Sequence, residues 1–228
     1  LASSDGELDL ALSFAQQAQE YISEHDIHQQ VILNFVQARA YMLVGDVLHA
    51  QRHAKKVHIL SETVGDYVGV IQAIRLLGDI EVLKGELYAA IKYYQTGIQL
   101  AMDPSFGWIR AYFHFQLVNI YREQNTLDLA HYHIQQMMIL CQHVFARRFY
   151  AYAYLASAQI LFSQGEMATI QHMLEVVKDN APAVGRKDIV RIAEAYCVRV
   201  WLRQGHMAEV AQWVEAHTQL TGSGPVYE

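Results

Sequence analysis

The sequence has few cysteines, few prolines and no apolar run long enough to cross a bilayer. Two cysteines in 228 residues are too few for a disulfide framework, so we expect a protein of the reducing cytoplasm. Three prolines leave long segments uninterrupted. The longest apolar stretch, around residues 149–162, contains Ser157 and Gln159 and is shorter than a transmembrane helix, so we expect no association with membranes.

The sequence also lacks an excess of positive charge. A formal net charge of -6 argues against a dedicated nucleic-acid-binding domain, so any contact with DNA is expected to come from a separate domain outside this chain. One basic segment, residues 49–58, gathers Arg52, Lys55 and Lys56, and we interpret it as a solvated helix face rather than an anion site. The apolar content of 53% and charged content of 18% indicate a folded chain with a continuous core.

Turn-forming residues recur at a fixed spacing along the whole chain. They are Gly6, Gly45, Gly85, Asn125, Gly165 and Gly205, separated by 39, 40, 40, 40 and 40 residues. Gly and Asn most readily enter the left-handed conformation that ends a helix, and a fixed period of this length is typical of helical repeat proteins. The sequence therefore predicts an all-α fold. We expect a right-handed α-solenoid of helical hairpins with a period of about 40 residues, forming a single domain over residues 1–228.

Each turn residue lies between two segments with helical periodicity. Upstream are apolar segments such as 31–44 and 151–162, which we expect to form the first helix of each hairpin. Downstream, a polar residue that can cap the second helix is followed by an apolar residue, as in Asp46 and Val47. The position four residues before the turn is mostly bulky and suits the groove between the two helices, although Glu81 breaks this column. Residues 61–67, 102–107 and 180–188 are expected to be irregular connections.

The repeat resembles the tetratricopeptide repeat. Its small and aromatic positions match Ala38, Tyr41, Gly45 and Ala50 in one repeat, and Gly78, Gly85, Ala90 and Tyr94 in the next. The longer period, with local sequences such as the one around Trp201, Gly205 and Trp213, is similar to the superhelical sensor region of large bacterial activators related to MalT. The resemblance extends over essentially the whole chain. It implies a parent protein that is an ATP-dependent regulator with a LuxR-type DNA-binding domain at its C-terminus.

We expect this chain to be a piece of such a parent. It begins almost directly at the turn of Gly6, residues 222–225 have the composition of a linker, and neither end has the polar outer face of a capping repeat. The chain contains neither the pattern of a phosphate-binding loop nor a basic helix-turn-helix segment, so ATP and DNA binding would belong to other domains of the parent. Uncapped ends also predict some self-association of the chain in isolation.

A ladder of polar residues marks the first helices. Six residues before successive turns lie Arg39, Asp79, Asn119, Gln159 and Arg199. In solenoids of this type the first helices line the concave face, so these side chains are expected to point into the hollow. Ten or thirteen residues before the turns, the same face carries Phe35, Arg75, Tyr112, Phe115 and Tyr152. We therefore predict a ligand-binding surface formed by Arg39, Arg75, Asp79, Tyr112, Phe115, Asn119, Tyr152, Gln159 and Arg199, because ligand sites combine an aromatic lining with a few placed polar groups.

A simpler interpretation of this surface stays open. The polar ladder is equally compatible with hydrogen bonds between repeats or with contact to water. For any single aromatic residue, packing in the core is the more common outcome.

The sequence gives little support for metal binding or catalysis. Among twelve histidines, His49 and His53 lie four residues apart on one helix face, but we identify no nearby Cys, Asp or Glu that completes a ligand set. Cys141 and Cys197 are expected to be buried, small apolar residues. No nucleophile has a base at motif spacing. We therefore expect a protein that is not an enzyme and that has no metal or cofactor.

Two functions fit these observations. The first is a regulatory sensor region of a bacterial, LuxR-family, MalT-like transcriptional regulator, which binds a small-molecule inducer, a protein or a peptide in its hollow. The alternative is a tetratricopeptide adaptor that binds a peptide or partner protein and has no role in transcription.

Overall fold

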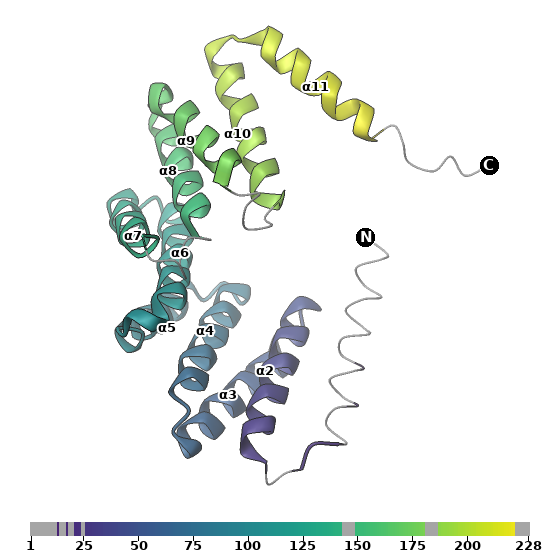
Figure 1. The fold of residues 1–228 in the computed structure, drawn as a ribbon, viewed down its shortest axis with the longest axis vertical. Helices are drawn as coiled ribbons and strands as arrows, with labels where there is room; N and C mark the ends of the chain where they lie inside the picture. Colours follow the sequence, from purple (N-terminus) through teal and green to yellow (C-terminus); the bar gives the residue numbers. More distant parts are fainter. Residues whose placement is uncertain are drawn as a thin grey trace, which may run out of the picture. The chain divides into compact units, whose positions relative to one another are not determined.

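The computed structural model describes residues 13, 17, 21–23, 26–142, 149–180 and 187–221. Within these ranges it consists of helices and their connections, without strands (Figure 1). The α-helices are α2 (Ile27–Leu43), α3 (Val47–Val64), α4 (Tyr67–Leu83), α5 (Leu87–Leu100), α6 (Gly107–Glu123), α7 (Leu127–Leu140), α8 (Tyr150–Gln164), α9 (Met167–Asn180), α10 (Lys187–Gln204) and α11 (Met207–Thr221), and a 3₁₀ helix, η1 (Pro104–Phe106), precedes α6. The predicted all-α fold is confirmed.

The helices form hairpins whose turns have the predicted period. Gly45, Gly85, Gly165 and Gly205 have φ angles of 78°, 77°, 84° and 78°, and Asn125 has a φ of 54°. Asn125 is the one non-glycine residue with positive φ in the described part of the chain. These residues join α2 to α3, α4 to α5, α8 to α9, α10 to α11 and α6 to α7. The 40-residue period is thereby confirmed, whereas Gly6 lies outside the described residues.

The same hydrogen bond closes every described hairpin turn. The backbone N–H of the residue after the turn residue donates to the carbonyl five positions earlier, for example from Asp46 to Tyr41 at 2.9 Å and from Thr126 to Tyr121 at 2.8 Å. This is the Schellman arrangement, which satisfies carbonyl groups that the helix end leaves without partners. At the start of α3, the Asp46 side chain also accepts from the backbone N–H of His49 at 3.1 Å. The equivalent residues before α5 and α7 make no such side-chain bond.

Rings stack between the two helices of a hairpin at the bulky position before the turn. Tyr41 stacks on His53 with ring centroids 5.4 Å apart, and Tyr121 stacks on His133 with centroids 5.5 Å apart. In both pairs the tyrosine lies four residues before the turn and the histidine eight residues after it. Burial lowers the pKa of His133 to about 4, so its ring is neutral and packs as an aromatic core residue.

Glu81 occupies the corresponding position in the second described hairpin and is buried. Its carboxylate accepts from Lys84 Nζ at 2.8 Å and from Gln51 Nε2 at 3.2 Å. The charge of Glu81 is therefore balanced by Lys84, which follows the last residue of α4, and its carboxylate also accepts a hydrogen bond from a side chain of α3.

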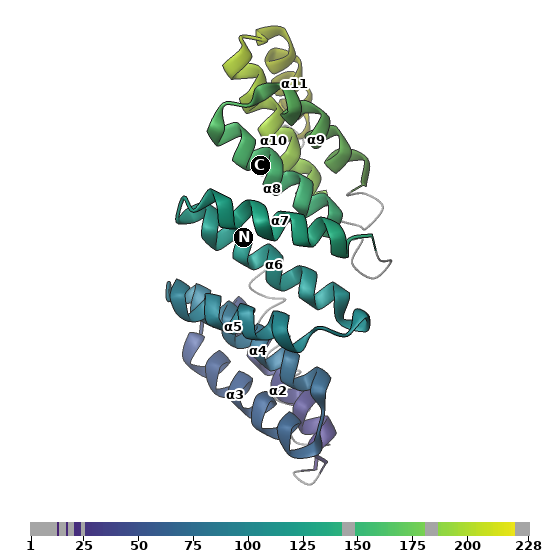
Figure 2. The same ribbon diagram turned by 90° about the vertical axis from the view of Figure 1, so that its left-hand side faces the viewer.

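The chain divides into two compact units, residues 1–120 and 121–228. The single domain expected over residues 1–228 remains a prediction. In the first unit, α2 packs on α3, α3 on α4, and α4 on α5, and α2 also contacts α4. In Figure 2, α3 and α5 lie in front of α2 and α4, so first and second helices form opposite sides of this unit. In the second unit, α8, α9 and α10 share one core that includes Leu155, Ile170, Leu174 and Ile189.

The connection between α3 and α4 is shorter than expected. Residues 61–67 are largely helical, since α3 ends at Val64 and α4 begins at Tyr67, so the predicted irregular segment there was wrong. Gly65 has a φ of 68°, and the Asp66 side chain caps α4 by accepting from the backbone N–H of Gly69. These two residues are sufficient to end one helix and start the next. Residues 104–106 form η1, and residues 181–186 lie outside the described part.

The expected environments of the basic segment of α3 and of both cysteines are confirmed. Arg52, Lys55 and Lys56 on α3 are exposed, and both Cys141 and Cys197 are buried free thiols. Burial raises the pKa of Cys141 to about 12. Among the described helices, none has the length and apolar character needed to span a membrane.

The turn geometry leads to a stability prediction. A Cβ atom would meet nothing within 4 Å at either Gly85 or Gly107, but Gly85 has a φ of +77° and Gly107 begins α6 with helical φ. We expect Gly85→Ala to lower the free energy of unfolding by about 1–2 kcal/mol, because alanine is strained in the left-handed region. Urea denaturation followed by circular dichroism measures this loss. Gly107→Ala is the matched control and should be neutral or stabilising; equal losses for both variants would contradict the role of the backbone angle.

Candidate functional site

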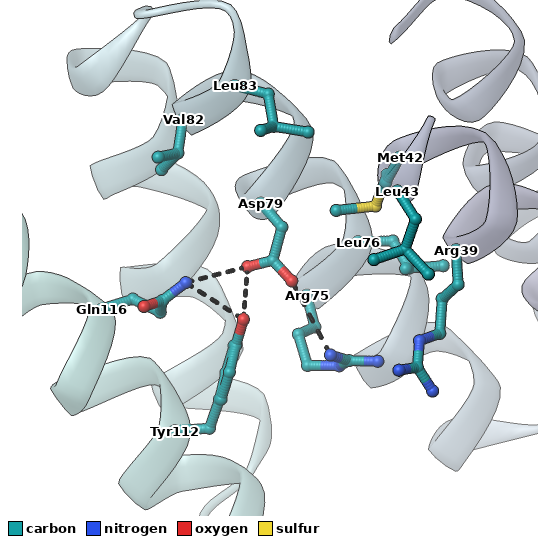
Figure 3. A pocket seen from close by; sticks show the side chains of 10 residues that line it. All are labelled: Arg39, Met42, Leu43, Arg75, Leu76, Asp79, Val82, Leu83, Tyr112 and Gln116. Carbon is teal, nitrogen blue, oxygen red and sulfur yellow. Dashed lines mark hydrogen bonds and ion pairs between the residues drawn. The ribbon is translucent and has the colours of Figure 1, made fainter. Parts of the chain in front are cut away.

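A cavity of about 370 Å³ lies between the first helices α2, α4 and α6 of the first unit (Figure 3). Its lining consists of Arg39, Met42, Leu43, Arg75, Leu76, Asp79, Val82, Leu83, Tyr112 and Gln116. Four of the nine residues predicted to bind a ligand, namely Arg39, Arg75, Asp79 and Tyr112, therefore meet at one site. They come from three successive hairpins and lie close together because those hairpins repeat in register.

The carboxylate of Asp79 is the centre of a hydrogen-bond network. Its Oδ1 accepts from Tyr112 Oη at 2.7 Å, from Tyr94 Oη at 2.8 Å and from Gln116 Nε2 at 3.3 Å. Gln116 also donates to Tyr112 Oη at 3.0 Å. The Asp79 side chain is only 11% exposed. Because the donors come from α5 and α6, the network joins α4 to both following helices.

Arg75 lies beside Asp79 and is held by contacts on several sides. Its Nη1 is 3.7 Å from Asp79 Oδ2, and its Nε donates to Gln72 Oε1 at 2.9 Å. The guanidinium carbon lies 5.6 Å from the centroid of the Phe35 ring and 5.4 Å from that of Tyr112. Cation–π contacts with two rings and a hydrogen bond at Nε fix the orientation of the guanidinium group.

Tyr94 reaches this site from a second helix because Gly78 has no side chain. A Cβ atom at Gly78 would lie 2.5 Å from Cε1 of Tyr94, so the tyrosine ring packs directly on the glycine. The ring is fully buried, and its hydroxyl group donates to the carboxylate of the adjacent residue, Asp79. This close approach therefore allows α5 to take part in the site.

Burial dominates the protonation behaviour of the network. It raises the pKa of Asp79, an effect that Arg75 and the three hydrogen-bond donors partly offset. Burial, together with the negative charge of Asp79, also raises the pKa of Tyr94 and of Tyr112. The two hydroxyl groups therefore keep their protons and act as donors to the carboxylate.

Arg39 and the apolar lining residues complete the cavity. Arg39 is exposed and forms no hydrogen bond or ion pair within the described part of the chain. Leu43 and Leu83 at the ends of α2 and α4 are 64% and 52% exposed, which is high for leucine. The site thus combines the guanidinium group of Arg39, the hydrogen-bond network of Asp79, and an apolar edge formed by Leu43 and Leu83.

The remaining predicted residues of the first unit lie next to the cavity lining. Asn119 donates from Nδ2 to Gln116 Oε1 at 3.4 Å, so it reaches the network through that glutamine. Phe115 is half-buried on α6 and is not among the residues that line the cavity.

The other three predicted residues belong to the second unit. Tyr152 and Gln159 are half-buried on α8. Arg199 on α10 is exposed, and its guanidinium carbon lies 5.1 Å from the ring centroids of both Phe162 and Tyr196. Their role in ligand binding remains a prediction.

The paired histidines of α3 have structural partners. His49 Nδ1 lies 2.7 Å from Asp46 Oδ2, and His53 Nδ1 lies 2.8 Å from Asn34 Oδ1. Both rings also stack on Tyr41. The acidic neighbour of His49 is the capping residue Asp46, which precedes it by three positions and reaches the ring. These contacts account for both side chains, and the described residues contain no group of three potential metal ligands.

Sequence reasoning missed two polar members of the site, Gln116 and Tyr94. Gln116 has a recognisable signal, since it lies four residues after Tyr112 and three before Asn119, on the same helix face. Tyr94 lies on a second helix, whereas only the first helices were expected to line the hollow. The only hint in the sequence is the small residue Gly78 on the helix before it.

The chain belongs to the family described as the MalT-like TPR region, whose pattern matches residues 1–226. This assignment agrees with the resemblance seen in the repeats. No curated protein matches the chain.

Solved structures support the fold. The crystal structure of BtubC (BKLC) from P. vanneervenii aligns with a TM-score of 0.74, covering 98% of this chain and 93% of that one. The two sequences are 14% identical, so the likeness concerns the fold alone.

The raised pKa of Asp79 leads to a prediction about pH. Above its ordinary value of 3.8, the unfolded chain releases a proton that the folded chain retains. The contribution of this group to stability is therefore fully present below that pH and is lost as the pH rises toward the folded pKa. We expect the free energy of unfolding of the native chain, relative to Asp79→Asn, to fall as the pH is raised above about 4 in urea denaturation.

Asp103 provides a control of opposite sign for this experiment. Hydrogen bonds from Ser105 lower the pKa of this exposed residue, so its contribution to stability is lost as the pH falls. The native chain should therefore lose stability relative to Asp103→Asn on acidification. If the native chain instead became more stable relative to Asp79→Asn as the pH rises, burial would not be the dominant influence on the pKa of Asp79.

The hydroxyl group of Tyr94 leads to a second prediction about the site. We expect Tyr94→Phe to lower the free energy of unfolding by about 1–2 kcal/mol, because it leaves the buried carboxylate of Asp79 with one donor fewer. Urea denaturation measures the loss. The control is Tyr88→Phe on the same helix, where the tyrosine is 80% exposed and should tolerate the change. Equal stability of the two variants would mean that the bond to Asp79 contributes nothing.

Proposed function

We propose that this chain is the sensor region of a bacterial, LuxR-family, MalT-like transcriptional regulator, and that it binds an effector in the cavity between α2, α4 and α6. The observation that carries the proposal is that three successive first helices of a MalT-like TPR region place Arg39, Arg75, Asp79 and Tyr112 around one cavity. In this proposal the chain binds and does not catalyse, and it needs no cofactor. The parent works in the cytoplasm and contacts ATP and DNA through other domains.

The cavity has features that suit selective recognition. The bonds of Asp79 to Tyr94, Tyr112 and Gln116 hold its polar centre in one arrangement before any ligand arrives. Preorganised groups of this kind reduce the entropy lost on binding. Binding that draws α2, α4 and α6 together would also change how successive hairpins pack, which gives a route from effector to the rest of a regulator.

A tetratricopeptide adaptor that binds a peptide or partner protein is the second candidate. It is favoured by the exposure of Leu43 and Leu83 beside the cavity, because an apolar edge suits a ligand larger than the cavity itself. In this case the chain would have no role in transcription.

The parent gene and a binding screen together test the proposal. We expect the gene to encode a nucleotide-binding domain before this region and a LuxR-type domain after it. Thermal denaturation of the chain against small metabolites and short peptides should identify an effector, and isothermal titration calorimetry gives its affinity. Asp79→Asn and Tyr112→Phe should each weaken binding by about tenfold, since each disturbs a group at the polar centre.

Asp103→Asn, which lies outside the cavity lining, is the matched control for affinity and should leave it unchanged. A parent gene that encodes neither flanking domain would contradict the regulator and favour the adaptor function. If the affinity for the effector is unchanged in Asp79→Asn and Tyr112→Phe, the effector does not bind in this cavity.

A further inference from the structure

The charged groups around the cavity are not balanced. Two guanidinium groups, those of Arg39 and Arg75, line it together with one carboxylate, that of Asp79. Figure 3 shows the side chains of Arg75 on α4 and Arg39 on α2 extending toward each other. Like charges that share a site repel each other unless an anion lies between them. The arrangement therefore favours a negatively charged group next to both arginines.

Asp79 forms an ion pair with Arg75 but not with Arg39, so one of the two guanidinium groups remains unbalanced. Oδ1 accepts three hydrogen bonds, and Oδ2 lies 3.7 Å from Arg75 Nη1, which is longer than a hydrogen bond. Arg39 has no partner within the described residues, which leaves its donors available to a ligand.

Arg75 is organised for the same ligand. Its Nε is occupied by Gln72, and the rings of Phe35 and Tyr112 hold the plane of its guanidinium group. An arginine fixed in this way loses little side-chain entropy when it binds an anion, and its planar group matches a carboxylate.

The other part of the cavity is apolar. Met42, Leu43, Leu76, Val82 and Leu83 supply aliphatic side chains from α2 and α4. The volume of about 370 Å³ lies within the range of about 300–1,000 Å³ that is usual for sites of small organic ligands. The ligand should therefore have a compact apolar body attached to its charged group.

We propose that the cavity binds an organic carboxylate with an apolar body of several carbon atoms. Its charged group lies between Arg39 and Arg75, and its body contacts Met42, Leu43 and Leu83. This inference rests on the proposed function and specifies the chemistry of its effector. Two sources can supply such a group: a free small-molecule acid, or the C-terminal carboxylate of a peptide that ends in an apolar residue.

Isothermal titration calorimetry with matched probes tests the chemistry. Hexanoate, 1-hexanol and hexylammonium share one apolar chain and differ in the charge of their head group. We expect hexanoate to bind at least about tenfold more tightly than the other two, and its affinity to fall as salt is added. A tripeptide ending in leucine, with its C-terminus free or amidated, provides the peptide arm. Binding by the free form and loss of binding on amidation would identify a peptide as the source.

Variants of the exposed Arg39 localise the site without disturbing the core. Arg39→Met keeps an apolar stem and should weaken carboxylate binding by about tenfold, whereas Arg39→Lys should retain part of it. The control is Arg52→Met, which removes an exposed arginine from α3, outside the cavity lining. Its affinity should equal that of the native chain.

Several outcomes would overturn the inference. They are equal affinity for hexanoate and 1-hexanol, undetectable binding of both hexanoate and the free tripeptide, or unchanged carboxylate affinity in Arg39→Met. Failure of the underlying proposal is a separate result. A neutral effector whose binding depends on Asp79 and Tyr112 would contradict the carboxylate ligand but leave the sensor function intact. A parent protein without regulator domains would contradict the sensor function but leave the carboxylate ligand intact.

Discussion

A residue in the left-handed conformation at every fortieth position is the constraint on which this structure depends. It ends each first helix, and the hydrogen bond from the next residue to the carbonyl five positions earlier fixes the direction in which the second helix leaves. Because the same turn recurs, residues at one position of the repeat occupy equivalent places in successive hairpins. That equivalence brings Arg39 and Asp79, which are forty residues apart, to the same cavity.

Asp79 shows how a polar group is accommodated in such an array. A buried carboxylate without partners would be strongly unfavourable, and here three donors and a nearby guanidinium group reduce that cost. The donors come from two different helices, so the network also links α4 to α5 and α6. Gly78 is essential to this arrangement, since any side chain there would displace the ring of Tyr94. The groups that organise the cavity therefore also hold the first unit together.

The sequence was sufficient for the fold and for part of the site. The spacing located the turns, and the position six residues before each turn identified Arg39 and Asp79. Both the turns and this position follow from the 40-residue period alone. Tyr94 could not be found in this way, since its participation depends on the close approach of its ring to Gly78. The same limit applies to Glu81 and His49, whose partners Gln51 and Asp46 are determined by side-chain reach. Contacts that depend on rotamers and on interhelical distance are not encoded by periodicity.

Members of the polar ladder occupy the same position in the repeat but differ in environment. Arg39 is exposed, Asp79 is nearly buried, and Asn119 is half-buried and bonded to Gln116. The repeating backbone therefore provides positions, whereas the residues that differ between repeats determine charge and shape. Because the turns depend on Gly45, Gly85 and Asn125 and not on the ladder, a ladder residue can change without altering the hairpins. In an array of this kind, ligand preference can diverge while the fold is retained, and the identity of the ligand must be argued from the individual side chains around the cavity.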